Sequence, residues 1–222
     1  MRYLITGGNR GIGLEFVRQL LERGDQVEAT ARAPRSAREL QTLLAAHPER
    51  LRLHACDVAS NGSVVALGHQ LAGTPIDVLI NNAGVMGTED SLGGFKFDDF
   101  LETLNVNAVG AVRVIQALLP NLRVGGGRKL IQITSGLGSI SDNRSGGYLD
   151  YRMSKAALDM LAVNLARELG GEGFSSIALQ PGWVQTDMGG EGAPTPVETS
   201  VGGMLKVIDG LQASDNGRFL GW

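Results

Sequence analysis

The chain of 222 residues carries 20 basic and 23 acidic side chains, which are well mixed along the sequence and give a net charge of −3. This balance excludes the strongly basic face of a nucleic-acid-binding protein, so we expect no nucleic-acid partner. A chain of this length accommodates one α/β domain with a substantial core. Glycine contributes 32 residues, about twice its usual share, which indicates many tight turns and close backbone approaches.

The few cysteines and histidines exclude two further kinds of site. Cys56 is the only cysteine, so the chain has no internal disulfide and suits a reducing compartment. His47, His54 and His69 are scattered without metal-ligand spacing, so no metal is expected. The first apolar run stops at Thr6, too early for a signal peptide, and no run approaches the ~20 residues that span a bilayer. We therefore expect a cytoplasmic protein without a membrane partner.

Short apolar runs alternate with helical patterns along the chain. The runs predict strands at 3–5, 27–31, 51–55, 76–80, 129–133, 176–179 and 218–220. Helical spacing predicts helices at 12–21, 34–47, 64–71, 97–120, 151–165 and 197–208. Near-continuous apolar strands separated by helices predict a doubly wound parallel α/β sheet of about seven strands, covered on both faces. Without a linker or repeat, 1–222 is expected to be a single domain whose ligands bind at the carboxyl ends of the strands.

The first predicted strand leads through a glycine-rich turn directly into a helix. Gly7, Gly11 and Gly13 permit a tight turn in which the backbone can approach a pyrophosphate. The free N–H groups and the dipole at the helix N-terminus favour such an anion. A glycine-rich turn also occurs in ordinary loops, but its position between a strand and a helix predicts nucleotide binding.

Tyr151 and Lys155 lie four residues apart on a predicted helix, so the phenol and the ammonium share one face. A cation at this distance lowers the pKa of a tyrosine, which then exchanges a proton more readily near neutral pH. The same spacing arises by chance in many amphipathic helices, so the pair alone does not establish catalysis.

Five motifs follow one another in a fixed order: Gly7-x-x-x-Gly11-x-Gly13, Asn81-Asn82-Ala83-Gly84, Asn107, Ser135 and Tyr151-x-x-x-Lys155. In this order and context, the chain resembles the short-chain dehydrogenases/reductases over essentially its whole length. The runs 6–15 and 181–188 are similar to the carbonyl reductase, sniffer and C-factor branch of that family. The resemblance implies a Rossmann-type fold, a nicotinamide dinucleotide cofactor and hydride transfer involving a small-molecule substrate.

The resemblance implies catalytic roles for four residues. Tyr151 would donate a proton to the substrate carbonyl oxygen, and Ser135 would form a hydrogen bond with the same oxygen. Lys155 would lower the pKa of Tyr151 and hold the nicotinamide ribose. Asn107 would bind a water that relays protons to Lys155, although an asparagine at this place can equally mark a helix kink.

The serine lies sixteen residues before Tyr151, rather than the usual thirteen or so of the family. We interpret the polar, turn-rich segment 142–147 as a short insertion. Ser139 is an alternative to Ser135, but Ser135 is better placed at a strand end. Tyr148 is followed four residues later by an arginine, which cannot replace lysine, so Tyr151 is the predicted proton donor.

The resemblance also implies cofactor contacts along the strand ends. Asp57 would hold the adenine amino group, and Val184 and Thr186 would meet the nicotinamide carboxamide. The complete predicted set is Gly7, Asn9, Arg10, Gly11, Ile12, Gly13, Arg32, Asp57, Val58, Asn82, Ala83, Gly84, Tyr151, Lys155, Pro181, Gly182, Val184 and Thr186.

Charge at the end of the second strand favours NADPH over NADH. An acid at this place would bind a free ribose 2′-hydroxyl and repel a phosphate. The strand ends at Arg32 without an acid, and Glu28 lies too early in the strand. Arg32 and Arg10 could both pair with a 2′-phosphate, or either could be an ordinary surface charge.

Apolar side chains expected near the reacting centre favour a hydrophobic aldehyde or ketone. The predicted pocket residues are Met86, Leu137, Tyr148 and Trp183, and the Gly- and Pro-rich segment 189–196 is predicted to form a short lid.

We therefore predict an NADP-dependent carbonyl reductase. An alcohol dehydrogenase or keto-acyl reductase acting on a defined metabolite is the alternative of the same class. A dinucleotide-binding signalling or sensor protein is the alternative of another class, although a sensor would not need the proton donor. A homodimer through the helices at 97–120 and 151–165 is a further prediction, with a monomer as its alternative.

Overall fold

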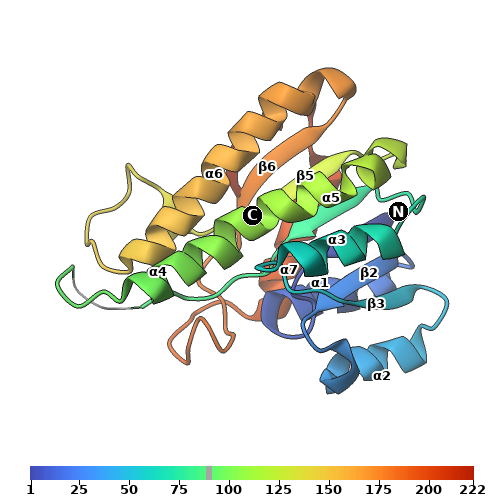
Figure 1. Cartoon of the computed structure of the whole chain (residues 1–222), viewed down its shortest axis with the longest axis horizontal. Helices are drawn as coiled ribbons and strands as arrows, with labels where there is room; N and C mark the ends of the chain where they lie inside the picture. The colour runs from blue at the N-terminus through green and yellow to red at the C-terminus, as the bar shows by residue number, and fades with distance from the viewer. Residues whose placement is uncertain (89–91) are drawn as a thin grey trace.

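Seven parallel strands form the centre of the computed structural model, which describes residues 1–88 and 92–222 (Figure 1). The strands are β1 Arg2–Ile5, β2 Gln26–Ala31, β3 Leu51–Ala55, β4 Val78–Asn81, β5 Lys129–Ile133, β6 Ser175–Gln180 and β7 Phe219–Gly221. They are ordered β3-β2-β1-β4-β5-β6-β7, and every neighbouring pair is parallel. The predicted doubly wound parallel sheet is confirmed.

Helices cover both faces of the sheet (Figure 1). They are α1 Gly11–Glu22, α2 Arg38–Ala46, α3 Asn61–Gln70, α4 Phe97–Leu104, α5 Gly110–Val124, α6 Leu149–Leu169 and α7 Val197–Gly210. Side chains of α1, α2 and α7 share one hydrophobic cluster with the sheet, and side chains of α3, α5 and α6 share the other. No helix among the described residues is long and apolar enough to cross a membrane.

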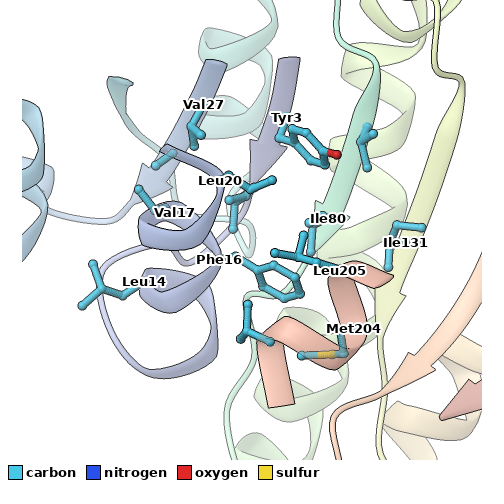
Figure 2. Packing of buried hydrophobic residues seen from close by; sticks show 14 of the residues in the cluster. Tyr3, Leu14, Phe16, Val17, Leu20, Val27, Ile80, Ile131, Met204 and Leu205 are labelled. Carbon is cyan, nitrogen blue, oxygen red and sulfur yellow. The ribbon is translucent and has the colours of Figure 1, made fainter. Parts of the chain in front are cut away.

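Successive residues of β1 alternate between the two hydrophobic clusters. Tyr3 and Ile5 belong to the cluster on the α1 and α7 face, whereas Leu4 belongs to the cluster on the α3 and α5 face. Figure 2 shows the first cluster, in which Phe16 of α1 lies close to Met204 of α7 above the sheet. Because both faces are buried, the strands are apolar almost without interruption, as parallel strands usually are.

The helix predicted at 34–47 is interrupted near its start. A 3-10 turn spans Pro34–Ser36, and α2 begins only at Arg38. The intervening Ala37 has a ψ of 88°, which is outside the helical region, so the two pieces are separate. Proline opens the short turn, where its missing N–H carries no cost.

The long helix predicted from Phe97 contains a π-helical turn, Asn105–Val109, between α4 and α5. In this turn the Gly110 N–H bonds the carbonyl of Asn105, five residues earlier. Single π turns inside α-helices are rare and are frequent at functional sites. This turn carries Asn107, which is 1% exposed.

Two further differences from the predicted elements lie at or beside Asn121 of α5. Its carbonyl accepts the N–H of Ile76, and β4 begins only at Val78. The helix continues through Pro120 to Val124 instead of ending at the proline. The loop that precedes β4 is therefore fixed against this part of α5.

Long loops follow β4, β5 and β6, and in Figure 1 their green, yellow and orange segments lie away from the N-terminus. The chain winds outward in one direction from β1 to β3 and in the other from β4 to β7. The order therefore reverses between β1 and β4, and a crevice at the carboxyl ends of these strands is the expected ligand site of such a sheet.

Candidate active site

A cavity of about 1090 Å³ lies at the carboxyl ends of the strands. Every residue predicted to contact a cofactor lines this cavity, from Gly7 in the first turn to Thr186 after β6. The four predicted pocket residues, Met86, Leu137, Tyr148 and Trp183, and the predicted catalytic Ser135 also line it. Asn107 and Ser139 are not part of its lining.

The first turn has the shape that an approaching pyrophosphate requires. Gly7 and Gly11 have φ angles of 67° and 52°, and a Cβ on Gly13 would lie 2.2 Å from the Gly7 carbonyl oxygen. Asn82 braces the turn, because its Nδ2 donates to the carbonyl oxygens of Thr6 and Gly7 at 2.9 and 3.1 Å. None of the described side chains caps α1, so its first N–H groups remain available for an anion.

The two arginines predicted near a 2′-phosphate have different surroundings. Arg10 Nη1 lies 3.1 Å from Asp187 Oδ2, which links the first turn to the segment after β6. Arg32 is exposed at the end of β2 and lines the cavity near Ser36 and Asp57. Arg10 is thus engaged by a carboxylate, whereas Arg32 is presented at the cavity wall.

Tyr151 and Ser135 both line the wall of the cavity. Tyr151 is 7% exposed, and burial raises the pKa of its phenol, while the neighbouring Ser135 hydroxyl opposes this rise. Desolvation, which disfavours the phenolate, therefore sets the direction of the shift, and the lowering predicted from Lys155 is not found. Ser139 instead donates to Asp142 Oδ2 at 2.8 Å.

Lys155 lies behind the tyrosine and is 5% exposed. Its Nζ donates to the Ile133 carbonyl oxygen at 2.9 Å and lies 5.5 Å from the centre of the Tyr151 ring. Burial lowers the pKa of Lys155 to about 8, and the carboxylate of Asp159 one turn further along α6 acts in the opposite direction. The ammonium therefore remains largely protonated at neutral pH despite its burial.

Asn107 holds two segments together through its side-chain amide. Its Oδ1 accepts the N–H of Val85 at 2.8 Å, and its Nδ2 donates to the Val85 carbonyl oxygen at 2.9 Å and to Ser154 Oγ at 3.0 Å. Ser154 Oγ in turn donates to the Tyr151 carbonyl oxygen at 2.7 Å. The π turn of Asn107 is thus tied to the loop after β4 and to the first turns of α6.

Asp150, next to the predicted proton donor, is fully buried. Its Oδ2 accepts the N–H of Thr88 at 3.0 Å and the hydroxyl of Thr103 at 3.1 Å, and its Oδ1 accepts the N–H of Tyr151 at 2.8 Å. A Cβ on Gly87 would lie 2.1 Å from this carboxylate, so the loop after β4 passes directly over it. Asp150 thereby joins that loop and α4 to the start of α6.

Asp150, Ser154, Asp159 and Arg152 are site residues that the sequence patterns did not predict. Ser154 and Asp159 lie three residues after Tyr151 and four after Lys155, which is the spacing of one helix face and would have been a usable signal. Asp150 resembles an ordinary acid in the first turn of a helix, so its burial leaves no mark in the sequence.

Three side chains fix the segment after β6. The Pro181 carbonyl oxygen accepts hydrogen bonds from Ser200 Oγ of α7 and Trp222 Nε1, each at 2.7 Å. Trp183 Nε1 donates to the Gly189 carbonyl oxygen at 2.7 Å. This segment forms one wall of the cavity. Hydrogen bonds from Ser200 of α7, from Trp222 and from Trp183 within the segment hold it in place.

The segment predicted as a lid, 189–196, folds back on the residues that follow β6. The Gln185 N–H donates to the Thr195 carbonyl oxygen at 2.9 Å, and the Thr195 N–H donates to that of Trp183 at 3.3 Å. Pro196 then leads directly into α7. Its role as a lid stays a prediction.

Among residues 1–88 and 92–222, no group of three or more His, Cys, Asp or Glu side chains is placed to hold a metal ion. A doubly wound sheet with a glycine-rich first turn, and with Tyr151, Lys155 and Ser135 at the same cavity, is the arrangement of a nicotinamide dinucleotide-dependent oxidoreductase. The sequence profile described as short chain dehydrogenase matches residues 2–196, and the chain belongs to this family.

Similar proteins include enzymes and a signal protein. The carbonyl reductase Sniffer of D. melanogaster superposes with a TM-score of 0.94 at 33% identity, over 99% of this chain and 96% of that one. An NADPH-bound carbonyl reductase from chicken fatty liver superposes with a TM-score of 0.93 at 37% identity, over 100% and 96%. The C-signal of Myxococcus xanthus is 50% identical over 145 residues, which are 65% of this chain and 87% of that protein.

Proposed function

We propose that this protein is an NADPH-dependent carbonyl reductase that converts hydrophobic aldehydes or ketones to alcohols, with Tyr151 as the proton donor. The observation that carries the proposal is that Tyr151, Ser135 and the glycine turn line one cavity. Two similar solved structures are named as carbonyl reductases, one of them with NADPH bound, and this supports the proposal.

The nicotinamide cofactor supplies the hydride when bound. In the proposed mechanism, the Tyr151 hydroxyl donates its proton to the carbonyl oxygen, and the Ser135 hydroxyl donates a second hydrogen bond to it. The raised pKa keeps Tyr151 protonated before the transfer. The Lys155 ammonium, 5.5 Å from the ring, then stabilises the phenolate that remains. General acid catalysis of this kind contributes roughly 10²–10⁴-fold to a rate.

Both N–H groups of the Asn107 amide are already donated, to the Val85 carbonyl oxygen and to Ser154 Oγ. The amide oxygen accepts one hydrogen bond, from the Val85 N–H, so the proton-relay water predicted here would have to donate to its second lone pair or bind another group. In the proposal, Asn107 therefore acts at least by keeping Val85 and the Tyr151 turn of α6 in register.

The preference for NADPH rests on Arg32, whose exposed guanidinium at the cavity wall can pair with a 2′-phosphate. The preference for a hydrophobic substrate rests on the apolar wall of Met86, Leu137, Tyr148 and Trp183. A cytoplasmic location and a homodimer stay predictions. For the dimer, exposed apolar side chains on α4 and α6, such as Phe97 and Met160, would supply the contact.

The test replaces Tyr151 by phenylalanine and follows NADPH oxidation over a panel of apolar aldehydes, ketones and quinones. We expect Tyr151→Phe to lower kcat by about 100-fold or more while the protein still binds NADPH, because the proton donor is lost and the other cofactor contacts remain. Tyr3→Phe removes a buried hydroxyl far from the cavity and serves as the matched control. Full turnover by Tyr151→Phe would rule out the proposed mechanism.

A second candidate is a signalling protein that uses its dinucleotide site as a sensor. The 50% identity to C-signal favours this candidate. The presence of Tyr151, Ser135 and Lys155 at the cavity argues against it, because a sensor needs a cofactor site but no proton donor. Tight NADPH binding without turnover on any member of the panel would support the sensor.

A further inference from the structure

We propose that Arg152 is a positioning residue for substrate specificity. Its guanidinium fixes the segment 145–148, so that Tyr148 forms a wall of the substrate pocket beside Tyr151. The inference rests on the proposed function for the nature of the substrate. It concerns a residue that does not line the cavity and that acts through one that does.

The Arg152 side chain connects two loops through hydrogen bonds to neutral oxygens. Its Nε donates to the carbonyl oxygens of Gly146 and Gly147 at 3.2 and 3.0 Å. Its Nη2 donates to Gly146 O at 3.0 Å and to Ser145 Oγ at 3.1 Å, and its Nη1 donates to Leu137 O at 3.3 Å. The half-buried guanidinium thus joins the turn after Ser135 to the loop that precedes α6.

The loop that Arg152 holds has an uncommon backbone path. Gly146, Gly147 and Tyr148 have φ angles of 65°, 71° and 49°, so three successive residues lie in the left-handed region. A tyrosine seldom adopts this region unless its surroundings impose it. The Arg152 N–H also donates to the Tyr148 carbonyl oxygen at 2.8 Å, so Arg152 bonds Tyr148 through its backbone and the three preceding residues through its side chain.

Other side-chain hydrogen bonds of this loop are local, from the Gly146 N–H to Asn143 Oδ1 and between Ser139 and Asp142. Residues 141–147 are all exposed, so the loop buries little apolar surface of its own. The forked, planar guanidinium reaches acceptors on both loops at once, which the single ammonium of a lysine cannot do. Loss of Arg152 removes the hydrogen bonds that join this loop to the turn after Ser135, so we expect Tyr148 to shift and α6 to stay intact.

Tyr148 and Leu137, which belong to the two loops joined by Arg152, both line the cavity. The distance between these loops sets the width of the pocket beside Tyr151. A fixed aromatic wall favours a flat, ring-bearing carbonyl, which can stack on it, over a short aliphatic aldehyde, which cannot.

The kinetic test compares Arg152→Ala and Arg152→Lys with the parent protein on benzaldehyde and propanal. We expect both variants to raise KM for benzaldehyde by about tenfold, with a much smaller change for propanal and an unchanged Kd for NADPH. The double variant Arg152→Ala/Tyr148→Ala should have the same KM as Tyr148→Ala alone, because both changes remove one wall. The proposal would be overturned if the effects of Arg152→Ala and Tyr148→Ala on KM were additive in the double variant. An unchanged KM for benzaldehyde in Arg152→Ala would also overturn it.

A second measurement does not depend on turnover. Arg144 lies in the exposed loop, where trypsin cleaves after arginine. We expect Arg152→Ala to be cleaved there about tenfold faster than the parent, while Arg167→Ala, at an exposed position of the same helix, is cleaved at the parent rate. Equal rates for Arg152→Ala and the parent would contradict the assignment. If the parent reduces no carbonyl, the proposed function fails, and this measurement still tests the role of Arg152.

Discussion

Lys155 experiences two opposing influences within one turn of α6. Burial lowers its pKa to about 8, and the carboxylate of Asp159 raises it. Asp159 also responds to this environment, since burial raises the pKa of its own carboxyl while Thr134 and Lys155 lower it. The charge on Lys155 at neutral pH therefore depends on an acid that does not line the cavity.

Asp159→Asn removes this anion and should lower the pKa of Lys155 below its present value, because the buried ammonium loses its attractive partner. With Lys155 neutral at a lower pH, the alkaline limb of the pH profile of kcat/KM is expected to move toward lower pH. Glu168→Gln, an exposed substitution on the same helix, should leave the limb in place. A limb that does not move in Asp159→Asn would show that Lys155 is not tuned by this carboxylate.

At the scale of the residue, the sequence predicts pairs on one helix but not the effect of burial. The four-residue spacing of Tyr151 and Lys155 predicts their shared face, and the two lie together. The sequence predicts a lowered pKa for Tyr151, and this is wrong because burial raises it. The extent of burial depends on the packing of distant segments. The contacts of Asp150 and Arg152 depend on loops whose paths, some with positive φ, have no simple sequence pattern.

Helix α1 joins the glycine turn to the core. Phe16 is fully buried and lies close to Met204 of α7, and α7 carries Ser200, which bonds the segment after β6 (Figure 2). The packing of α1 against α7 in one hydrophobic cluster thus supports two walls of the cavity.

Phe16→Ala should lower the free energy of unfolding by about 3–5 kcal/mol, because it removes a ring from a fully enclosed site and leaves a cavity. Phe16→Leu, which keeps most of the volume, should cost clearly less. Val65→Ala, at an exposed position of α3, should change the free energy by less than about 0.5 kcal/mol. Urea unfolding measures all three, and equal losses for Phe16→Ala and Val65→Ala would contradict this description of the core.

At the scale of the element, apolar runs predict the strands nearly to their ends, since β5 has the predicted bounds and β2 begins one residue earlier. The π turn at Asn105–Val109 was not predicted. Its central Asn107 bonds Val85, which lies 22 residues earlier, so the reason for the wide turn is tertiary. The break at Ala37 likewise lies within a stretch whose apolar spacing is helical.

For the whole molecule, the cavity collects loops from both halves of the sheet. A ligand in the cavity contacts the first turn, the end of β2 and the segment after β6. It therefore links three segments that are otherwise connected through the hydrophobic core. Such a ligand binds the folded state alone and therefore stabilises the entire fold.

NADPH at about 100 times its Kd should add about 2.7 kcal/mol to the free energy of unfolding. For a chain of this size, that corresponds to a rise in Tm of roughly 5–10 °C. NADH at the same concentration should raise Tm less, because it lacks the phosphate that Arg32 is proposed to bind. Arg32→Ala should reduce the difference between the two cofactors, measured by differential scanning fluorimetry. Equal shifts with NADPH and NADH in the parent protein would contradict the preference for NADPH.

The topology of the whole sheet could be predicted because each strand and helix has its own pattern and parallel strands must be joined by crossovers. The location of the site follows from the same topology, and the glycine turn marks one end of it. The shape of the substrate side could not be predicted, because it is built from the loops after β4, β5 and β6. Their paths are fixed by hydrogen bonds that Asp150 accepts and that Arg152 and Trp222 donate, rather than by periodic patterns.

The chain has two tryptophans, and both bond the segment after β6. Trp183 bonds Gly189, Trp222 bonds Pro181, and both indole rings remain partly exposed, at 59% and 44%. All indole fluorescence of the protein therefore originates beside one wall of the cavity. The emission spectrum of the unlabelled protein is a local optical reporter of that wall, and any movement of the wall can be followed in real time without an added dye.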